Sequence, residues 1–357
     1  MQKTYLLKNI IAPFLSLTIL SLFSCSMPLD DMAKMSPREM IEYLTRRTRN
    51  ARVTVGIIQN GEMSFTVFGE NGRVLPNNEY IYEIGSISKA ITGHLFARAI
   101  HENLLTLDNL DGSIDLFLNL IPKDYYPTIR RLLTHTSGYR FQYYYFLPPK
   151  FAPFENPFYG VTREMLIHHV RNINLENRDY PWVYSNSGIA VAGMVLESIF
   201  DEDYVSLVNR YFRSLGLNNT RVGNGKGNLS HYYRWNNGNP YIAMGGLVST
   251  VTDLMKFVQM QMNQTLAYAQ YAHRVWAEDV DTGFSFPKLG NHTDAMGLGW
   301  FIDRGNNIIW HGGAVDTFDT YVGFDPDEGI AVVILSNIRS KSIPAWVIGS
   351  QKIKELR

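Results

Sequence analysis

Strand-like segments lie near both ends of this 357-residue chain, and the middle has no comparable strand pairs. Near the start, "ARVTVGIIQNGEMSFTVFG" contains two β-rich runs around Asn60-Gly61, which is a hairpin signal. Near the end, turn residues separate four more such runs and predict an antiparallel meander: "GLGWFID", "NIIWHGG", "TFDTYVGFDP" and "GIAVVILSN". The pattern predicts an α/β (α+β) fold, with one domain built from both ends of the chain around an inserted helical domain.

The expected domain boundaries follow from this arrangement. The discontinuous α/β domain is placed at residues 36–104 and 236–357, and the helical domain at 105–235. In the middle, "TIRRLLTHTSGY" and "GIAVAGMVLESIF" are helical in pattern, and the final "IPAWVIGSQKIKELR" predicts a terminal helix. These helices are expected to flank the antiparallel sheet or to form the inserted domain.

The clearest local signal is a helix start in "SPREMIEYLTRR". Ser36 is expected as the N-cap, Pro37 at the first helical position and Glu39 as the residue that completes a capping box. This motif predicts a helix directly before the first strand.

The charge balance excludes one class of partner. The chain has 33 basic and 33 acidic residues and no strongly basic tail. Nucleic acid is therefore not expected as a partner. The length is sufficient for a substantial core.

The N-terminus has the pattern of a secretory signal. Two lysines precede an apolar run from Ile10 to Phe23 that is too short for a comfortable membrane span of ~20 residues. Cys25, the only cysteine, follows in "LFSC", which resembles the lipobox of bacterial lipoproteins. We expect a signal peptide at 1–24, a tether at 25–35 and a lipid on Cys25 that anchors the secreted protein at the bacterial cell membrane. The alternative is a plain signal peptide with an incidental cysteine.

The segment "YEIGSISK" places a serine and a lysine three residues apart at the start of a predicted helix. Residues at this spacing share a helix face, so Lys89 can bring its amine to the hydroxyl of Ser86. A desolvated lysine can lose its proton and serve as base to a weak nucleophile. The alternative is that Ser86 caps the helix and Lys89 is a surface residue. The cation would then lie near the positive end of the helix dipole, which is unfavourable.

A second Ser-x-x-Lys pair, Ser285 and Lys288, indicates how weak the motif is alone. Pro287 and the surrounding residues make that copy a poor helix start.

Two further elements carry polar groups suited to catalysis. Tyr184 and Asn186, in "YPWVYSNSGIA", place a phenol and an amide two residues apart before a helix, where they can transfer a proton and hold a substrate. The alternative is a turn in which Asn186 caps the helix. His311-Gly312-Gly313 follows a strand-like run, and its glycines would allow a substrate to approach closely. The alternative is an ordinary turn at a strand end.

Taken together and in this order, these elements resemble the serine penicillin-recognising superfamily of β-lactamases, DD-peptidases and related esterases. The closest group is the class C β-lactamase-related serine hydrolases, and "LLTHTSGY" and "GGLVSTVTDLMKF" also look like its framework segments. The resemblance implies the β-lactamase/transpeptidase-like fold: an antiparallel sheet flanked by terminal helices, plus a helical domain, with the active site between them.

The resemblance also implies a role for each site residue. Ser86 becomes the nucleophile, Lys89 its base partner and Tyr184 the second proton-transfer group. Asn186 would hold the substrate amide or ester. The backbone N–H groups of Ser86 and of Ala314, which follows Gly313, would form the oxyanion hole.

His311 stands where the penicillinases of this superfamily have lysine. A largely neutral imidazole is a poorer anchor for the carboxylate of a drug, so this departure weakens the case for a true β-lactamase. It leaves DD-peptidases open, because some carry histidine there. Lys288-Leu289-Gly290 is a competing motif, but it lacks the flanking strand pattern.

The sequence therefore predicts a secreted serine hydrolase that is acylated on Ser86 and hydrolyses an ester or amide, with a D-alanyl peptide or another peptidoglycan-type substrate as a candidate. The alternatives are a true β-lactamase and a non-catalytic penicillin-binding or sensor lipoprotein. No cofactor is implied, and His168-His169 lacks a carboxylate at ligand spacing, so no metal is expected. The aromatic segment from Arg140 to Tyr159 could equally wall the cleft, pack internally, or contact a membrane or another subunit.

Overall fold

The computed structural model describes residues 29–140, 156–178, 180–285, 287–289, 291–338 and 344–357. The expected signal peptide, Cys25 and most of the aromatic segment 140–159 lie outside the described residues.

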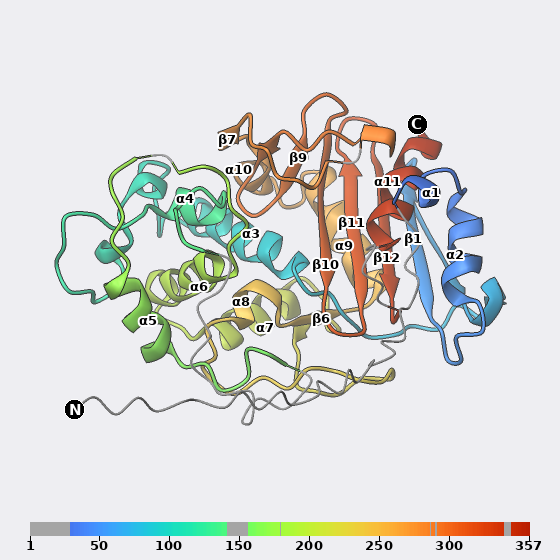
Figure 1. Ribbon diagram of the computed structural model, residues 1–357, viewed down its shortest axis with the longest axis horizontal. Helices are drawn as coiled ribbons and strands as arrows, with labels where there is room; N and C mark the ends of the chain where they lie inside the picture. Colours follow the sequence, from blue (N-terminus) through green and yellow to red (C-terminus); the bar gives the residue numbers. More distant parts are fainter. Residues whose placement is uncertain (1–28, 141–155, 179, 286, 290, 339–343) are drawn as a thin grey trace, which may run out of the picture.

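A nine-stranded antiparallel sheet joins the two ends of the described chain (Figure 1). The first strand pairs with the last, and Val53 lies opposite Ser336. The predicted hairpin is present, since Gln59 and Glu62 flank the turn at Asn60-Gly61. In spatial order the strands are β3 (Val74–Leu75), β2 (Glu62–Phe68), β1 (Val53–Gln59), β12 (Ile330–Ser336), β11 (Asp319–Asp325), β10 (Ile308–Ala314), β9 (Phe301–Asp303), β8 (Ala295–Met296) and β7 (Ala277–Glu278). The prediction that both ends of the chain share one sheet is confirmed.

Helices cover both faces of this sheet, which explains the uninterrupted apolar run in β12. Successive side chains of a strand point to opposite faces. Val332 and Ile334 therefore pack in the core on one face, while Val333 and Leu335 pack in the core on the other. The terminal helices α2 and α11 cover the first face and α9 covers the second.

The helix start predicted at Ser36 is present. At α2 the Ser36 hydroxyl accepts the N–H of Glu39, and the Glu39 carboxylate accepts the N–H of Ser36, so the predicted capping box is confirmed. The α-helices are α1 (Leu29–Met32), α2 (Pro37–Thr45), α3 (Ile87–His101), α4 (Ile129–Leu133), α5 (Arg163–Asn172), α6 (Asn186–Phe200), α7 (Tyr204–Ser214), α8 (Ile242–Gly245), α9 (Val251–Met262), α10 (Ala269–His273) and α11 (Pro344–Leu356). Short 3₁₀ turns occur at Glu70–Gly72, Asp108–Asp111, Ile114–Leu116 and Pro287–Leu289.

The helix α3 is buried along most of its length and runs between the sheet and the helical portion formed by α4 to α8 (Figure 1). It packs against α6, α8 and α10 and touches β10 and β11. The first turn of α3 consequently lies where the sheet and the helical portion meet.

A small second sheet holds the chain that enters α3. Its order is β4 (Tyr82–Glu83), β6 (Leu247–Ser249) and β5 (Arg221–Val222), all antiparallel. The strand β5 is a short strand in the segment expected to be helical. The domain boundaries at 104/105 and 235/236 remain predictions. Within the described residues, none of the helices combines the length and hydropathy needed to cross a bilayer.

Candidate active site

Ser86 precedes α3 in a tight turn that keeps its side chain free of any capping role. The turn is closed by main-chain bonds from Ser88 to Gly85 and from Lys89 to Ser86. Ser86 occupies the N-cap position with helical backbone angles, φ −65° and ψ −9°, and its side chain makes no capping hydrogen bond. The expectation of Ser86 as a side-chain N-cap is therefore wrong. Helical backbone angles at Ser86 turn its hydroxyl toward Lys89 instead.

Lys89 points its amine at Ser86 from one helical turn away. The Nζ atom donates to Ser86 Oγ at 2.9 Å and to the Met244 carbonyl oxygen at 2.8 Å. The Lys89 side chain is fully buried, and within the described chain no carboxylate forms an ion pair with it. Burial lowers the pKa of Lys89 well below its usual value. The spacing prediction for this pair is met, and the alternative of a surface lysine is wrong.

Tyr184 completes a cluster of three hydroxyl and amine groups. The Nζ atom of Lys89 lies 4.9 Å from the centroid of the Tyr184 ring. Burial raises the pKa of the Tyr184 phenol, and a hydrogen bond with the Ser86 side chain acts in the opposite direction. The phenol is thus neutral near pH 7 and can give up or relay its proton next to Ser86.

His135 also belongs to this cluster, and the sequence reasoning missed it. Its ring packs against Tyr184, with centroids 4.7 Å apart, and its Nδ1 atom accepts the N–H of Ser185 at 3.2 Å. Because Nδ1 accepts a hydrogen bond, the ring proton of the neutral imidazole lies on Nε2. Burial lowers the pKa of His135, and Lys89 and His311 lower it further. The sequence signal for it is the histidine in "THTSGY", a segment that resembles only the framework of the superfamily.

Asn186 begins α6 but does not cap it. The Ser185 hydroxyl accepts the N–H of Gly188 at 2.9 Å and serves as the cap, so the alternative role of Asn186 as cap is wrong. Asn186 is 6 % exposed, and its Oδ1 atom has no hydrogen-bond donor in the described part of the chain. A buried amide oxygen without a donor is costly, and a substrate N–H would satisfy it.

The end of β10 presents a main-chain N–H to the Ser86 turn. Hydrogen-bonded and non-hydrogen-bonded pairs alternate along an antiparallel ladder. Since Val315 donates to the Phe318 carbonyl, the preceding pair of Ala314 and Asp319 is non-hydrogen-bonded, and the Ala314 N–H points away from β11. The Ala314 amide thus faces away from β11; that it forms an oxyanion hole together with the Ser86 amide remains a prediction.

Two glycines allow the strand and the turn to approach. Gly85 has φ +50°, and a Cβ atom there would lie 2.9 Å from the Ala314 nitrogen. A Cβ atom on Gly313 would lie 2.0 Å from the Ile84 carbonyl oxygen. The Thr320 hydroxyl on β11 donates to the same Ile84 oxygen at 3.1 Å and so holds the chain before Ser86 against the sheet.

His311 lies within the core beside the cluster and is not a cation. Its Nδ1 atom donates to the Gly312 carbonyl oxygen at 2.6 Å, which leaves Nε2 unprotonated. Burial lowers the pKa of His311 to about 3, and the nearby Lys89 is the second cause of this shift. The imidazole is neutral at physiological pH, as the sequence reasoning expected.

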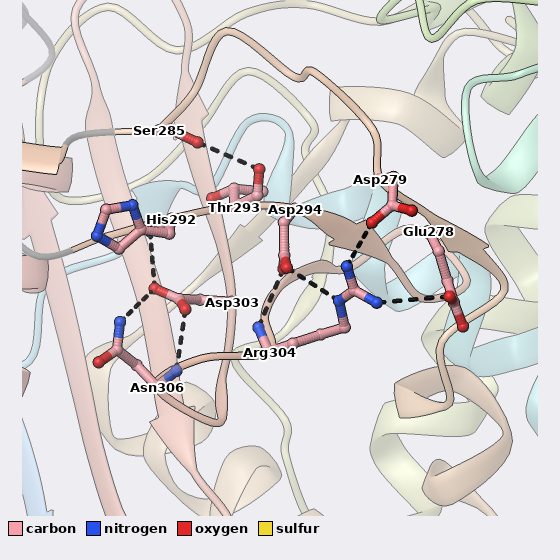
Figure 2. A network of polar contacts seen from close by, with 9 residues as sticks. All are labelled: Glu278, Asp279, Ser285, His292, Thr293, Asp294, Asp303, Arg304 and Asn306. Atoms are coloured by element: carbon pink, nitrogen blue, oxygen red, sulfur yellow. Dashed lines mark hydrogen bonds and ion pairs between the residues drawn. The ribbon is translucent and has the colours of Figure 1, made fainter.

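The competing motifs lie elsewhere. Ser285 donates its hydroxyl hydrogen to the Thr293 carbonyl oxygen, in the network of Figure 2. Gly290 of the competing lysine motif lies outside the described residues. His168 contacts Asn172 on α5, and the described residues contain no group of three or more histidine, cysteine or acidic side chains placed to hold a metal.

Comparison with known proteins identifies the family. The family model "Beta-lactamase" matches residues 38–344. The chain belongs to the β-lactamase family. Its fold is the β-lactamase/transpeptidase-like α/β fold of the class C enzymes and D-alanine carboxypeptidases, and it is a serine hydrolase-like member of the family.

Three similar proteins are each about 20% identical to this β-lactamase family member. The β-lactamase/D-alanine carboxypeptidase of Yersinia pestis, complexed with citrate, has a TM-score of 0.68 and 20% identity, covering 89% of this chain and 95% of that one. The octameric penicillin-binding protein homologue of Pyrococcus abyssi has a TM-score of 0.66 and 22% identity, covering 85% and 73%. Protein flp of Staphylococcus aureus (strain MRSA252) is 21% identical over 294 residues, covering 74% of this chain and 54% of flp. The chain spans about half the length of the curated relatives it matches.

Proposed function

We propose that this protein is a serine hydrolase that forms an acyl-enzyme on Ser86 and then hydrolyses it. The observation that carries the proposal is the 2.9 Å contact between the Ser86 hydroxyl and the amine of a fully buried Lys89. Burial lowers the pKa of Lys89 and so favours its neutral form, and only the neutral amine can accept a proton.

The steps follow from the positions of these groups. Lys89 takes the proton of Ser86, and Ser86 Oγ forms a bond to the carbonyl carbon of an ester or amide. The Ser86 and Ala314 N–H groups stabilise the oxyanion. Tyr184 gives a proton to the departing alcohol or amine as its bond to carbon breaks. Water then attacks the acyl-enzyme and gives a proton to the Tyr184 oxygen. The bond between Ser86 Oγ and the acyl carbon breaks as Lys89 returns its proton to Ser86, and the acid is released.

The neutral state of His311 affects which class of substrate the site would favour. A pKa of about 3 leaves no charge on this imidazole to attract a carboxylate. This supports an ester or an uncharged amide over a β-lactam drug. A D-alanyl peptide stays a candidate substrate only if a group other than His311 receives its terminal carboxylate. True β-lactamase activity is the less favoured alternative.

Secretion and lipid anchoring are part of the same proposal. Their support is the apolar run before Cys25, which ends in a lipobox-like sequence. Labelling cells with a radioactive fatty acid tests this point, and Cys25→Ala should lose the label.

The test of the proposed function is covalent labelling of the purified protein with a fluorophosphonate and with a fluorescent penicillin. Wild type should be labelled by at least the fluorophosphonate, and Ser86→Ala should not. A turnover screen with D-alanyl peptides, short-chain esters and nitrocefin then ranks the substrate classes. Ligand binding by a folded protein that neither labels nor turns over any of these would favour the non-catalytic sensor instead.

A further inference from the structure

A cavity of about 620 Å³ lies next to the catalytic cluster on the side of β7. Its wall combines aromatic rings, including Trp182 and Trp276, with the carboxylates of Glu278, Asp279 and Asp281. Cavities of a few hundred cubic ångströms with aromatic walls and a few polar groups are typical of small-molecule sites. The mechanism above gives this cavity no role.

Trp182 connects the cavity to the cluster. Its ring lies 6.1 Å from the ring of Tyr184 and 5.7 Å from that of His135, measured between centroids. Thr136, next to His135, also lines the cavity. The Trp182 ring therefore belongs both to the wall of the cavity and to the aromatic packing around Tyr184.

The charges at the cavity leave an excess of negative charge. Arg304 forms ion pairs with Asp279 at 2.7 Å, with Glu278 at 3.4 Å and with Asp294 at 2.9 Å, so one cation serves three carboxylates (Figure 2). Asp281 is exposed, accepts the N–H of Gly283, and forms no ion pair within the described part of the chain.

The nearby cations do not reverse this balance. Arg130 lines the cavity, but its Nε atom lies 2.6 Å from the Asp111 carboxylate. Arg274 is placed 4.9 Å from the centroid of the Trp276 ring. Arg178 lies 4.5 Å from the centroid of the Tyr180 ring and pairs with Glu176. With these groups counted, the carboxylates near the cavity still outnumber the basic groups.

We propose that this cavity binds a positively charged ammonium group carried by the substrate. Aromatic faces attract cations, and this attraction strengthens when the cation loses water. Carboxylates add Coulomb attraction and repel a carboxylate ligand. The inference deepens the proposed function: it predicts that the preferred ester or amide carries an amine or quaternary ammonium away from the scissile bond.

The direct test is equilibrium binding of choline, followed by tryptophan fluorescence, because two tryptophans line the cavity. The matched uncharged probe is 3,3-dimethylbutan-1-ol, in which carbon replaces nitrogen. Choline should bind at least about fivefold more tightly than the alcohol, and added salt should weaken only choline. Equal binding of the two probes would overturn the inference.

A pair of variants locates the site. Asp281→Asn keeps an oxygen for the N–H of Gly283 and removes the charge, so choline affinity should fall about threefold or more while the alcohol is unaffected. The control Glu328→Gln removes one exposed carboxylate charge from the turn between β11 and β12 and should change neither. If Asp281→Asn leaves choline affinity unchanged, the proposed ammonium site at this cavity is refuted.

A kinetic test separates this inference from the proposed function. Acetylcholine should be hydrolysed with a higher kcat/KM than 3,3-dimethylbutyl acetate, and Asp281→Asn should reduce that preference. Hydrolysis of both esters at the same rate would count against the cation site and leave the hydrolase intact. Hydrolysis of neither would count against the hydrolase, and the fluorescence titration would still decide the site.

Discussion

The Nζ atom of Lys89 lies 2.9 Å from Ser86 Oγ, in the first turn of α3, where the positive end of the helix dipole disfavours a cation. The same atom donates to the Met244 carbonyl oxygen, and burial lowers its pKa. A position that is poor for a charged lysine is suitable for a neutral amine that accepts a proton. The departure from the usual helix-start pattern thus has a chemical explanation.

Replacing Lys89 by arginine should slow acylation strongly while retaining a hydrogen-bond donor. Arginine stays protonated at any working pH, so it cannot take the proton of Ser86. We expect the rate of fluorophosphonate labelling to fall by about 10²- to 10⁴-fold, the usual contribution of a general base. Circular dichroism provides the folding control. Labelling of a folded Lys89→Arg protein at the wild-type rate would show that Lys89 is not the base.

Ser88 offers the matched control for Ser86. Its hydroxyl accepts the N–H of Leu247 at 3.2 Å and so binds α3 to β6. Ser88→Ala leaves that buried N–H without an acceptor, which should lower the free energy of unfolding by about 1–3 kcal/mol. The variant should still be labelled, in contrast to Ser86→Ala. The opposite result for the two variants would refute the helical spacing argument.

Much of the fold could be predicted because its signals are local. The capping box at Ser36, the Asn60-Gly61 turn and the β-rich runs separated by turn residues each depend on a few neighbouring residues. The Ser86 and Lys89 pair belongs to the same class, since helix geometry alone brings residues three apart together.

The parts that sequence reasoning missed depend on contacts between distant segments. The Met244 carbonyl that binds Lys89 is a main-chain group, so its side chain gives no signal. The helix expected in "TIRRLLTHTSGY" is only α4, because His135 adopts φ +62° and turns the chain. That turn brings His135 beneath Tyr184, a contact across about 50 residues that no local pattern encodes.

His135 should act as a positioning residue for Tyr184. Its Nδ1 atom holds the N–H of Ser185, the neighbour of Tyr184. His135→Ala removes both this acceptor and the ring beneath the phenol, and we expect kcat to fall about tenfold or more with a smaller change in KM. His135→Asn can return an acceptor near Nδ1 and should recover part of the loss. Equal loss in both variants would argue for a purely structural role of the ring.

Gly313→Ala should separate the two donors of the oxyanion hole. The added Cβ atom would lie 2.0 Å from the Ile84 carbonyl, so the strand and the turn must move apart. The expected result is a loss of about 10²-fold or more in kcat, comparable to removal of one oxyanion donor. Alanine at Gly329, a glycine with open space around it and φ +64°, is the control and should cost stability without a comparable loss of kcat. Wild-type kcat in Gly313→Ala would refute the assignment.

Glu83 should make stability depend on pH. It lies three residues before Ser86, accepts the N–H of Tyr233 through Oε1, and is 3 % exposed. Burial, with Asp316 as a smaller cause, raises its pKa from 4.5 to about 8. Between these two values the folded protein keeps a proton that the unfolded chain has released. The contribution of Glu83 to stability is therefore fully present below pH 4.5 and is lost as the pH rises through 8.

Glu83→Gln tests this dependence, because glutamine keeps the acceptor for Tyr233 and cannot ionise. Urea unfolding at pH 5 and at pH 8.5 measures the free energy of unfolding of both proteins. Wild type should lose about 1–4 kcal/mol more than the variant between the two pH values, since one buried carboxyl group ionises only in wild type. Parallel losses in the two proteins would place the pKa of Glu83 near its ordinary value and remove the prediction.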